Sequence, residues 1–242
     1  MTGKINKQIK PRLKRILYKS ALWFLVISVS LTVIYRFVPV PVTPLALIRC
    51  VEQATDKNRK VRLDKDWVSM DQISPYMAQA VIGSEDMNFL EHNGFDFEAI
   101  EKAIQHNKSS KKKVGASTIS QQTAKNVFLW NGRNWVRKGL EAYFTVLIET
   151  LWPKQRILEV YLNVIEFGDG IYGVEAASQA YYHKPASKLT RSEAAMLAAI
   201  LPSPLRWSPV HPTKFLRKRQ AHILQAMGYV RNSGEFATLS LN

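Results

Sequence analysis

Residues 115–126 read Gly-Ala-Ser-Thr-Ile-Ser-Gln-Gln-Thr-Ala-Lys-Asn and contain the most specific pattern in the chain. Ser117 can cap a helix that continues through Gln121 to Phe128. The polar stripe of that helix consists of Thr118, Gln122 and Lys125. Such a stripe is typical of a solvated helix face, but paired glutamines, a cap and a lysine also suit a sugar and a phosphate. The segment therefore predicts a helix whose polar face either meets solvent or binds a phosphorylated sugar.

The rest of the sequence beyond residue 63 is also typical of helices. Pro75 follows Ser74 as a helix start, and residues 190–193 form a capping box before an Ala/Leu-rich helix that stops at Pro202. The other expected helices span residues 135–152, 154–165 and 172–182, and a last one opens at Pro212 and ends at Gly228. Convincing alternating strands and internal repeats are missing. The sequence predicts a mainly α fold in one compact domain.

The N-terminal region has the pattern of a membrane anchor. Residues 1–20 carry seven Lys or Arg and no acid, and residues 21–42 are apolar except for Arg36. This apolar stretch has the length of a bilayer span if Arg36 snorkels to the interface. A cleaved signal lacks its small-residue cleavage site here, and a buried core helix does not explain the basic cluster. We therefore expect a basic cytoplasmic tail (1–20), an uncleaved transmembrane helix (21–42), a connector (43–64) and an extracytoplasmic domain (65–242).

The net charge of the chain limits its partners. It is +15, and +8 remains without the first twenty residues. A basic balance favours nucleic acid, phospholipid or a phosphorylated substrate, and the expected topology disfavours nucleic acid and ATP.

Cys50 is the only cysteine, so no intrachain disulfide can form. The five histidines are scattered, which argues against a transition-metal site.

Three further blocks of the sequence combine charged or polar residues with aromatic or apolar ones. In residues 83–94, Glu85, Phe89 and His92 would share one face if the segment is helical. In residues 133–141, Arg137 and Glu141 have the spacing of a surface ion pair. The third block, Ile-Leu-Glu-Val-Tyr-Leu-Asn at 157–163, is typical of packing. Each block alone also fits an ordinary helix.

The order and spacing of these blocks resemble the glycosyltransferase domain of bacterial peptidoglycan polymerases, the family 51 glycosyltransferases. The matching patterns are Glu-Asp-x-x-Phe-x-x-His, Gly-x-Ser-Thr-Ile-x-Gln-Gln-x-x-Lys-Asn, Arg-Lys-x-x-Glu and Ile-Leu-Glu-x-Tyr-Leu-Asn, with a further match from Ser192 to Pro202. The resemblance covers roughly residues 65 to 210. It implies a lysozyme-like helical domain, and the length of the chain suggests the monofunctional form.

The resemblance also implies a reaction and a site. The family joins disaccharide units of lipid II, with the growing lipid-linked glycan as donor. By this resemblance Glu85 is the general base and Glu141 the second important glutamate, and cations near Glu85 are expected to keep it ionised. The positions matching phosphate-contacting cations are Lys125, Arg133, Arg137 and Lys138. The other expected substrate-binding residues are Asp86, Phe89, His92, Ser117, Thr118, Gln122 and Asn126.

No cofactor is required by the sequence, although Mg²⁺ or Mn²⁺ on the substrate diphosphate is plausible. The expected partners are lipid II, the growing glycan, the inner membrane and other proteins of cell-wall synthesis or division.

Two further expectations concern local segments. Residues 127–130 and Trp135 either enter the outer leaflet or pack in the core, and residues 108–113 form a mobile basic loop over the cleft.

Two alternatives from other classes remain at this point. A membrane-bound glycan hydrolase or lytic enzyme would share a catalytic glutamate and the lysozyme-like fold, but it gives no role to the clustered cations. A non-catalytic scaffold of cell-wall synthesis would not depend on Glu85.

Overall fold

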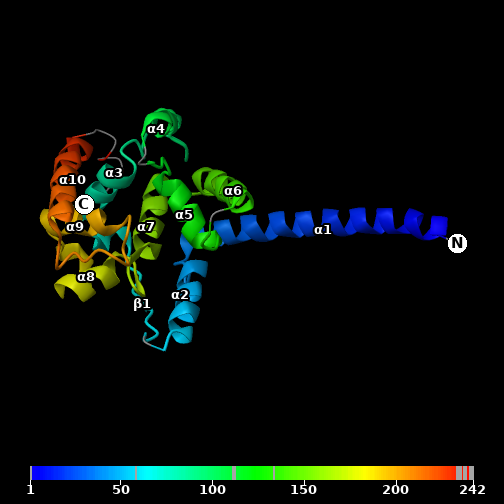
Figure 1. Cartoon of the computed structure of the whole chain (residues 1–242), viewed down its shortest axis with the longest axis horizontal. Helices are drawn as coiled ribbons and strands as arrows, with labels where there is room; N and C mark the ends of the chain where they lie inside the picture. The colour runs from blue at the N-terminus through cyan, green and yellow to red at the C-terminus, as the bar shows by residue number, and fades with distance from the viewer. Residues whose placement is uncertain are drawn as a thin grey trace. The chain divides into compact units, whose positions relative to one another are not determined.

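The computed structural model describes residues 2–57, 59–110, 113–132 and 134–232, with Phe236 and Leu239, and side chains from residue 14 onward. The chain divides into two units, Met1–Val38 and Pro39–Asn242. The first unit contains helix α1 (Thr2–Phe37) (Figure 1), which at 1.5 Å per residue is about 54 Å long. Its part Lys14–Phe37 is long and apolar enough to cross a membrane. The helix ends before the expected boundary at residue 42 because the prolines at 39 and 41 cannot donate helical hydrogen bonds.

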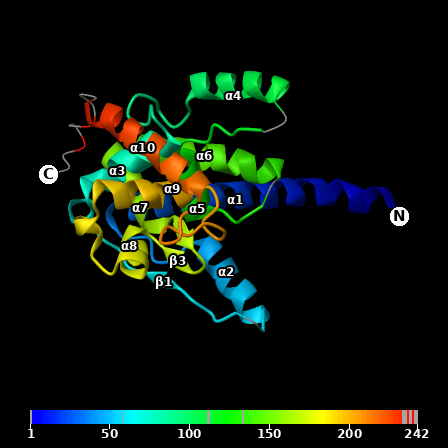
Figure 2. The same cartoon turned by 60° about the vertical axis from the view of Figure 1, so that its left-hand side comes forward.

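The second unit is mainly helical, so the predicted fold class, a lysozyme-like helical domain after one N-terminal apolar helix, is confirmed (Figures 1 and 2). Its elements in chain order are α2 (Pro44–Thr55), β1 (Asp64–Lys65), the 3₁₀ helix η1 (Met70–Gln72), α3 (Pro75–Glu85), α4 (Phe97–Ser109), α5 (Ile119–Phe128), α6 (Trp135–Leu151), α7 (Lys154–Val164), β2 (Glu166–Gly168), β3 (Ile171–Tyr172), α8 (Val174–Tyr182), the 3₁₀ helix η2 (Ala186–Lys188), α9 (Arg191–Ile200) and α10 (Lys214–Asn232).

Two groups of helices form the core. Helix α3 packs against α9 and α10, and α5 packs against α6 and α7. Helix α9 is buried from Ala194 to Ile200, which explains its run of alanines and leucine. Gly83 allows α10 to approach α3 closely, because a Cβ atom at this position would lie 3.0 Å from the Cβ atom of Ala226. This close approach brings the C-terminal helix to the end of α3, where Glu85 lies.

Side-chain caps mark the starts of α2, α4, α5, α6 and α9, and two predicted boundaries need correction. The predicted start of α3 after Ser74 and the capping box at Thr190 are confirmed. Thr118, and not Ser117, caps α5: its Oγ1 accepts from the Gln121 amide at 3.1 Å, and Gln121 Oε1 accepts from the Thr118 amide at 3.0 Å. The predicted end of the last helix at Gly228 is also wrong, because α10 continues to Asn232.

A small sheet was not expected from the sequence. Its strand order is β1-β3-β2, with β1 parallel and β2 antiparallel to β3. Each strand has only two or three residues, which is too short for an alternating pattern to be recognised.

The expected connector, residues 43–64, contains α2 and belongs to the second unit. Its Gln53 side chain donates to Asp169 Oδ1 at 2.8 Å and accepts from the Arg62 amide at 2.8 Å. These hydrogen bonds link α2 to the turn between β2 and β3 and to the segment that follows α2.

Candidate active site

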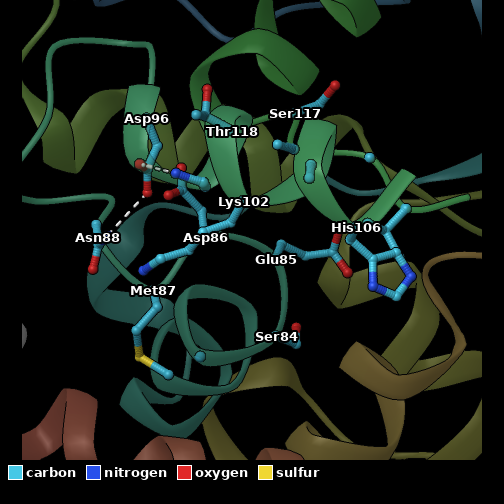
Figure 3. Close-up of a pocket in the computed structure, with 16 residues that line it drawn as sticks. Ser84, Glu85, Asp86, Met87, Asn88, Asp96, Lys102, His106, Ser117 and Thr118 are labelled. Atoms are coloured by element: carbon cyan, nitrogen blue, oxygen red, sulfur yellow. Dashed lines mark hydrogen bonds between the residues drawn. The ribbon is translucent and has the colours of Figure 1, made fainter. Parts of the chain in front are cut away.

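Glu85 is the last residue of α3 and lies at the edge of a cleft of about 480 Å³ (Figure 3). One wall consists of residues 83–88, and a second consists of residues 114–118 before α5. Helix α4 supplies a third wall with Lys102 and His106, two residues that the sequence did not indicate. The cleft therefore joins residues 83–88 of one sequence block to residues 115–118 of another, beside the Glu85 carboxylate.

Asp86 and His92 shape the loop beside Glu85. Asp86 accepts from the Ile119 amide at 2.9 Å and from His92 Nε2 at 2.9 Å. The Gly94 amide donates to His92 Nδ1 at 3.1 Å, which selects the tautomer with its proton on Nε2. The predicted single helical face of Glu85, Phe89 and His92 is wrong, because α3 ends at Glu85. The turns after α3 bring the Phe89 and His92 rings into contact instead.

Phe89 is fully buried and does not line the cleft, which corrects its predicted place in a substrate subsite. The Phe89 ring meets the His92 ring edge-on at 6.4 Å, and Lys154 Nζ lies 4.7 Å from the centroid of the Phe89 ring. Thr118 is also buried, and its Oγ1 donates to the Gly94 carbonyl at 2.7 Å. Ser117 is exposed and lines the cleft. Phe89 thus supports the loop, Thr118 both supports the loop and lines the cleft, and Ser117 is accessible to a ligand.

The Glu85 carboxylate is held from two sides. Gln122 Nε2 on α5 donates to Glu85 Oε2 at 3.1 Å. The Arg219 guanidinium on α10 lies 3.6 Å from Glu85 Oε1, and its Nε donates to the Ala199 carbonyl at 3.1 Å. The sequence does not single out Arg219, because nothing in the basic run at 217–219 indicates which side chain turns inward.

Burial is the largest influence on Glu85 and raises the pKa of its carboxyl group. The hydrogen bond from Gln122 and the charges of Arg219 and Lys125 oppose this shift and lower the pKa. Burial, and not the nearby cations, therefore decides the direction of this pKa shift, and the sequence does not show how far Glu85 is removed from water. That Glu85 is ionised at neutral pH stays a prediction. A raised pKa makes the carboxylate a stronger base when it is ionised.

Glu141 on α6 organises a cluster of cations. It is 3% exposed, and it accepts from Arg137 Nη1 at 2.9 Å and from Lys138 Nζ at 2.5 Å. Burial lowers the pKa of the Lys125 ammonium, Glu141 raises it, and Arg137 and Lys138 lower it further. Arg137 Nε is buried and has no hydrogen-bond partner among the described residues. The cluster therefore has an excess of positive charge and an unused donor, as an anion site requires.

Lys125 connects this cluster to Glu85, because its charge acts on both carboxylates. Together with Asn126 it also lines a small cavity of about 40 Å³, which Leu45 of α2, Leu129 and Trp130 help to enclose. The predicted phosphate contact Arg133 lies outside the described residues, as do two residues of the basic loop, Lys111 and Lys112. Lys108 is part of α4.

The apolar run near these cations is divided between core and surface. Val127 and Leu129 are buried, and the Phe128 ring stacks on Phe144 at 4.4 Å. Trp130 and Trp135 are exposed, the latter by 91%. Core packing therefore explains residues 127–129, and the two tryptophans remain available to a membrane.

No group of three or more His, Cys, Asp or Glu side chains that could hold a metal ion occurs in the part of the chain that the structure describes. Near the cations, the Glu141 carboxylate is already engaged by Arg137 and Lys138. A metal on the substrate diphosphate would therefore rely mainly on phosphate oxygens.

The helical fold, the buried glutamate and the adjacent cation cluster fit a glycosyltransferase, and the comparisons with known proteins show that class. The Transglycosylase family model matches residues 52–228. The chain belongs to this family.

The chain is also similar to three proteins named biosynthetic peptidoglycan transglycosylase. The protein from Bdellovibrio bacteriovorus is 54% identical over 212 residues, 88% of this chain and 84% of that protein. The one from Caulobacter vibrioides is 56% identical over 202 residues, 84% of this chain and 85% of that protein. The one from Shigella boydii is 58% identical over 195 residues, 80% of this chain and 81% of that protein. These matches confirm the prediction of a monofunctional peptidoglycan glycosyltransferase.

Proposed function

We propose that this glycosyltransferase polymerises lipid II into β-1,4-linked glycan and releases undecaprenyl diphosphate. The growing lipid-linked glycan is the donor, and the 4-hydroxyl of an incoming lipid II is the acceptor. The observation that carries the proposal is the pairing of Glu85 with a separate cation cluster, linked through Lys125. A single carboxylate is enough for this reaction. It takes the proton of the acceptor hydroxyl, and no second carboxyl group is needed because the diphosphate leaving group needs charge stabilisation more than protonation.

Glu85 acts as the general base in this proposal. The acceptor hydroxyl proton passes to the carboxylate while its oxygen bonds to the anomeric carbon of the donor. The bond from that carbon to the diphosphate oxygen breaks, its electron pair goes to the diphosphate, and the centre inverts from α to β. Gln122 and Arg219 hold the carboxylate in place, and Ser117 contacts sugar in the cleft.

The leaving diphosphate binds at Lys125, Arg137 and Lys138, and we expect Arg133 and Asn126 to contribute. The buried donor at Arg137 Nε supports this assignment, because a phosphate oxygen would satisfy it. Glu141 positions the cations without contacting the reacting atoms. Mg²⁺ or Mn²⁺ bridging the phosphate oxygens would add to the same charge stabilisation.

In this proposal the apolar helix α1 spans the inner membrane, the N-terminus lies in the cytoplasm and the catalytic unit lies outside. The basic residues before the span support this orientation. Trp130 and Trp135 are exposed beside the cation cluster, where they would meet the outer leaflet or the lipid of the substrate. Other proteins of cell-wall synthesis or division are proposed partners.

One observation favours a second candidate, a glycan hydrolase. Burial raises the pKa of Glu85, and a hydrolase needs a protonated carboxylic acid to expel a sugar alkoxide. The cation cluster has no role in that reaction.

The two reactions give opposite changes in glycan length. The purified full chain should convert fluorescent lipid II into longer glycan in membranes and should leave finished cell-wall glycan intact. Shortening of the finished glycan, without growth from lipid II, would establish the hydrolase instead.

A further inference from the structure

Residues 194–232 contain six Lys or Arg and no Asp or Glu. Arg219 turns toward Glu85, whereas four of the other cations are exposed on the loop after α9 and on the first turns of α10. These are Arg206, Lys214, Arg217 and Lys218. The proposed polymerisation assigns no role to these four charges.

Apolar side chains are exposed among the same cations. Leu205, Val210 and Phe215 are 46%, 45% and 53% exposed. The Trp207 ring lies 5.5 Å from the Phe215 ring, centroid to centroid, and Val210 and Arg217 line the same shallow hollow. We call these residues the basic–aromatic patch; it comprises Leu205, Arg206, Trp207, Val210, Lys214, Phe215, Arg217 and Lys218.

The backbone holds the patch in a defined shape. The Ser203 carbonyl accepts from the amides of Arg206 and Trp207 at 3.0 and 3.1 Å, so the loop turns at this point. Leu216, between Phe215 and Arg217, is buried and anchors the first turns of α10 to the core. The exposed apolar side chains are therefore presented by ordered backbone.

We infer that the basic–aromatic patch binds the surface of a bilayer containing anionic phospholipid. Exposed aliphatic and aromatic side chains favour the boundary between headgroups and acyl chains, and Lys and Arg beside them attract anionic headgroups. A bilayer satisfies both sets of groups at once. This contact goes beyond the proposed polymerisation and does not depend on it.

The chain itself favours a lipid surface as the occupant. The second unit begins at Pro39, two residues after the apolar helix ends at Phe37. The short tether keeps the patch at high effective concentration near the bilayer, so even weak lipid affinity gives a populated contact. Lys218 and Arg219 are neighbours on α10, and Arg219 contacts Glu85. Binding of lipid at Lys218 would therefore also restrain the position of α10 beside Glu85.

A fluorescent label on the full chain tests this inference. In a Cys50→Ser background, Phe215→Cys is labelled with an environment-sensitive dye and reconstituted in nanodiscs containing phosphatidylglycerol. We expect blue-shifted emission and quenching by a quencher attached to the lipid chains. Tyr229→Cys is the matched control, because Tyr229 is 74% exposed on the same helix and lies outside the patch. Leu205→Cys repeats the measurement from the loop.

Charge dependence completes the test. Lys214→Gln and Lys218→Gln should each lower the ratio of lipid-bound to free label by roughly fivefold in phosphatidylglycerol, with a much smaller effect in phosphatidylcholine. Labels at 205 and 215 that are no more quenched than the label at 229 would overturn the inference. A blue shift that follows protein concentration and not lipid composition would also overturn it, because it would identify a second copy of the chain as the occupant.

Discussion

Replacing Glu141 with glutamine removes the carboxylate that Arg137 and Lys138 both contact. The Arg137 and Glu141 side chains are 11% and 5% exposed, so the variant leaves a buried guanidinium without its counter-charge. Lys138 is 44% exposed, so water screens its charge and the loss of its ion pair with Glu141 costs little. The expected destabilisation therefore comes mainly from Arg137.

Breaking a buried ion pair costs about 3–5 kcal/mol, and the lower end applies here because glutamine keeps one acceptor oxygen. For a protein of this size each kcal/mol shifts Tm by about 2–4 °C. Glu141→Gln should therefore lower Tm by about 6–12 °C. Inorganic diphosphate should restore part of the loss, because it supplies negative charge to the same cations.

Thermal unfolding of the full chain in detergent, followed by tryptophan fluorescence, measures this shift. Glu98→Gln is the matched control, since Glu98 and Lys102 form an i,i+4 pair at 2.5 Å with side chains 69% and 71% exposed. Its Tm should not change measurably. Equal shifts for the two variants, or no response of Glu141→Gln to diphosphate, would refute the assignment of a buried anion site.

Three further predictions test the site. Arg219→Gln removes a charge that lowers the pKa of Glu85, so the acidic limb of the pH profile of lipid II polymerisation should move to higher pH; a shift to lower pH would contradict this role. Asp86→Asn should destabilise the chain by about 1–3 kcal/mol in denaturant titrations, because asparagine cannot accept from both the Ile119 amide and His92 as the carboxylate does; unchanged stability would remove Asp86 as a support of the loop. Trp130→Asp should impair turnover of membrane-bound lipid II far more than Tm, and equal losses would indicate core packing.

Much of the fold could be predicted from local sequence chemistry. Ser74-Pro75 marks a helix start because proline has no amide hydrogen that the first helical position would leave unpaired. The Thr190 capping box marks another because its side chains satisfy free amides. The error at Ser117 arose because Ser117 and Thr118 are both good caps, and only the contacts of Gln121 distinguish them. Gly228 is typical of a helix end, but α10, which packs against α3 and α9, continues past it to Asn232. Strand β1 depends on pairing with β3, about 100 positions further along the chain, and β2 and β3 form a hairpin of very short strands. Local pattern reveals neither.

The candidate site was predictable where motif residues also meet in space. The Gln122 side chain donates a hydrogen bond to Glu85. The Glu141 carboxylate forms ion pairs with both Arg137 and Lys138. Arg219 and His106 could not be predicted, because tertiary packing alone brings α10 and α4 to the cleft. The direction of the Glu85 pKa shift could not be predicted for the same reason, since burial is a property of the folded chain.

The role of Glu85 is tested most directly by the rate of lipid II polymerisation by Glu85→Gln, measured beside Glu91→Gln, an exposed carboxylate six residues further along the chain. Glutamine can still accept from Gln122 but cannot take the acceptor proton. The rate should fall by about 10²- to 10⁴-fold in Glu85→Gln, while lipid II binding and the rate of Glu91→Gln stay at wild-type levels. Polymerisation by Glu85→Gln at the wild-type rate would contradict the account.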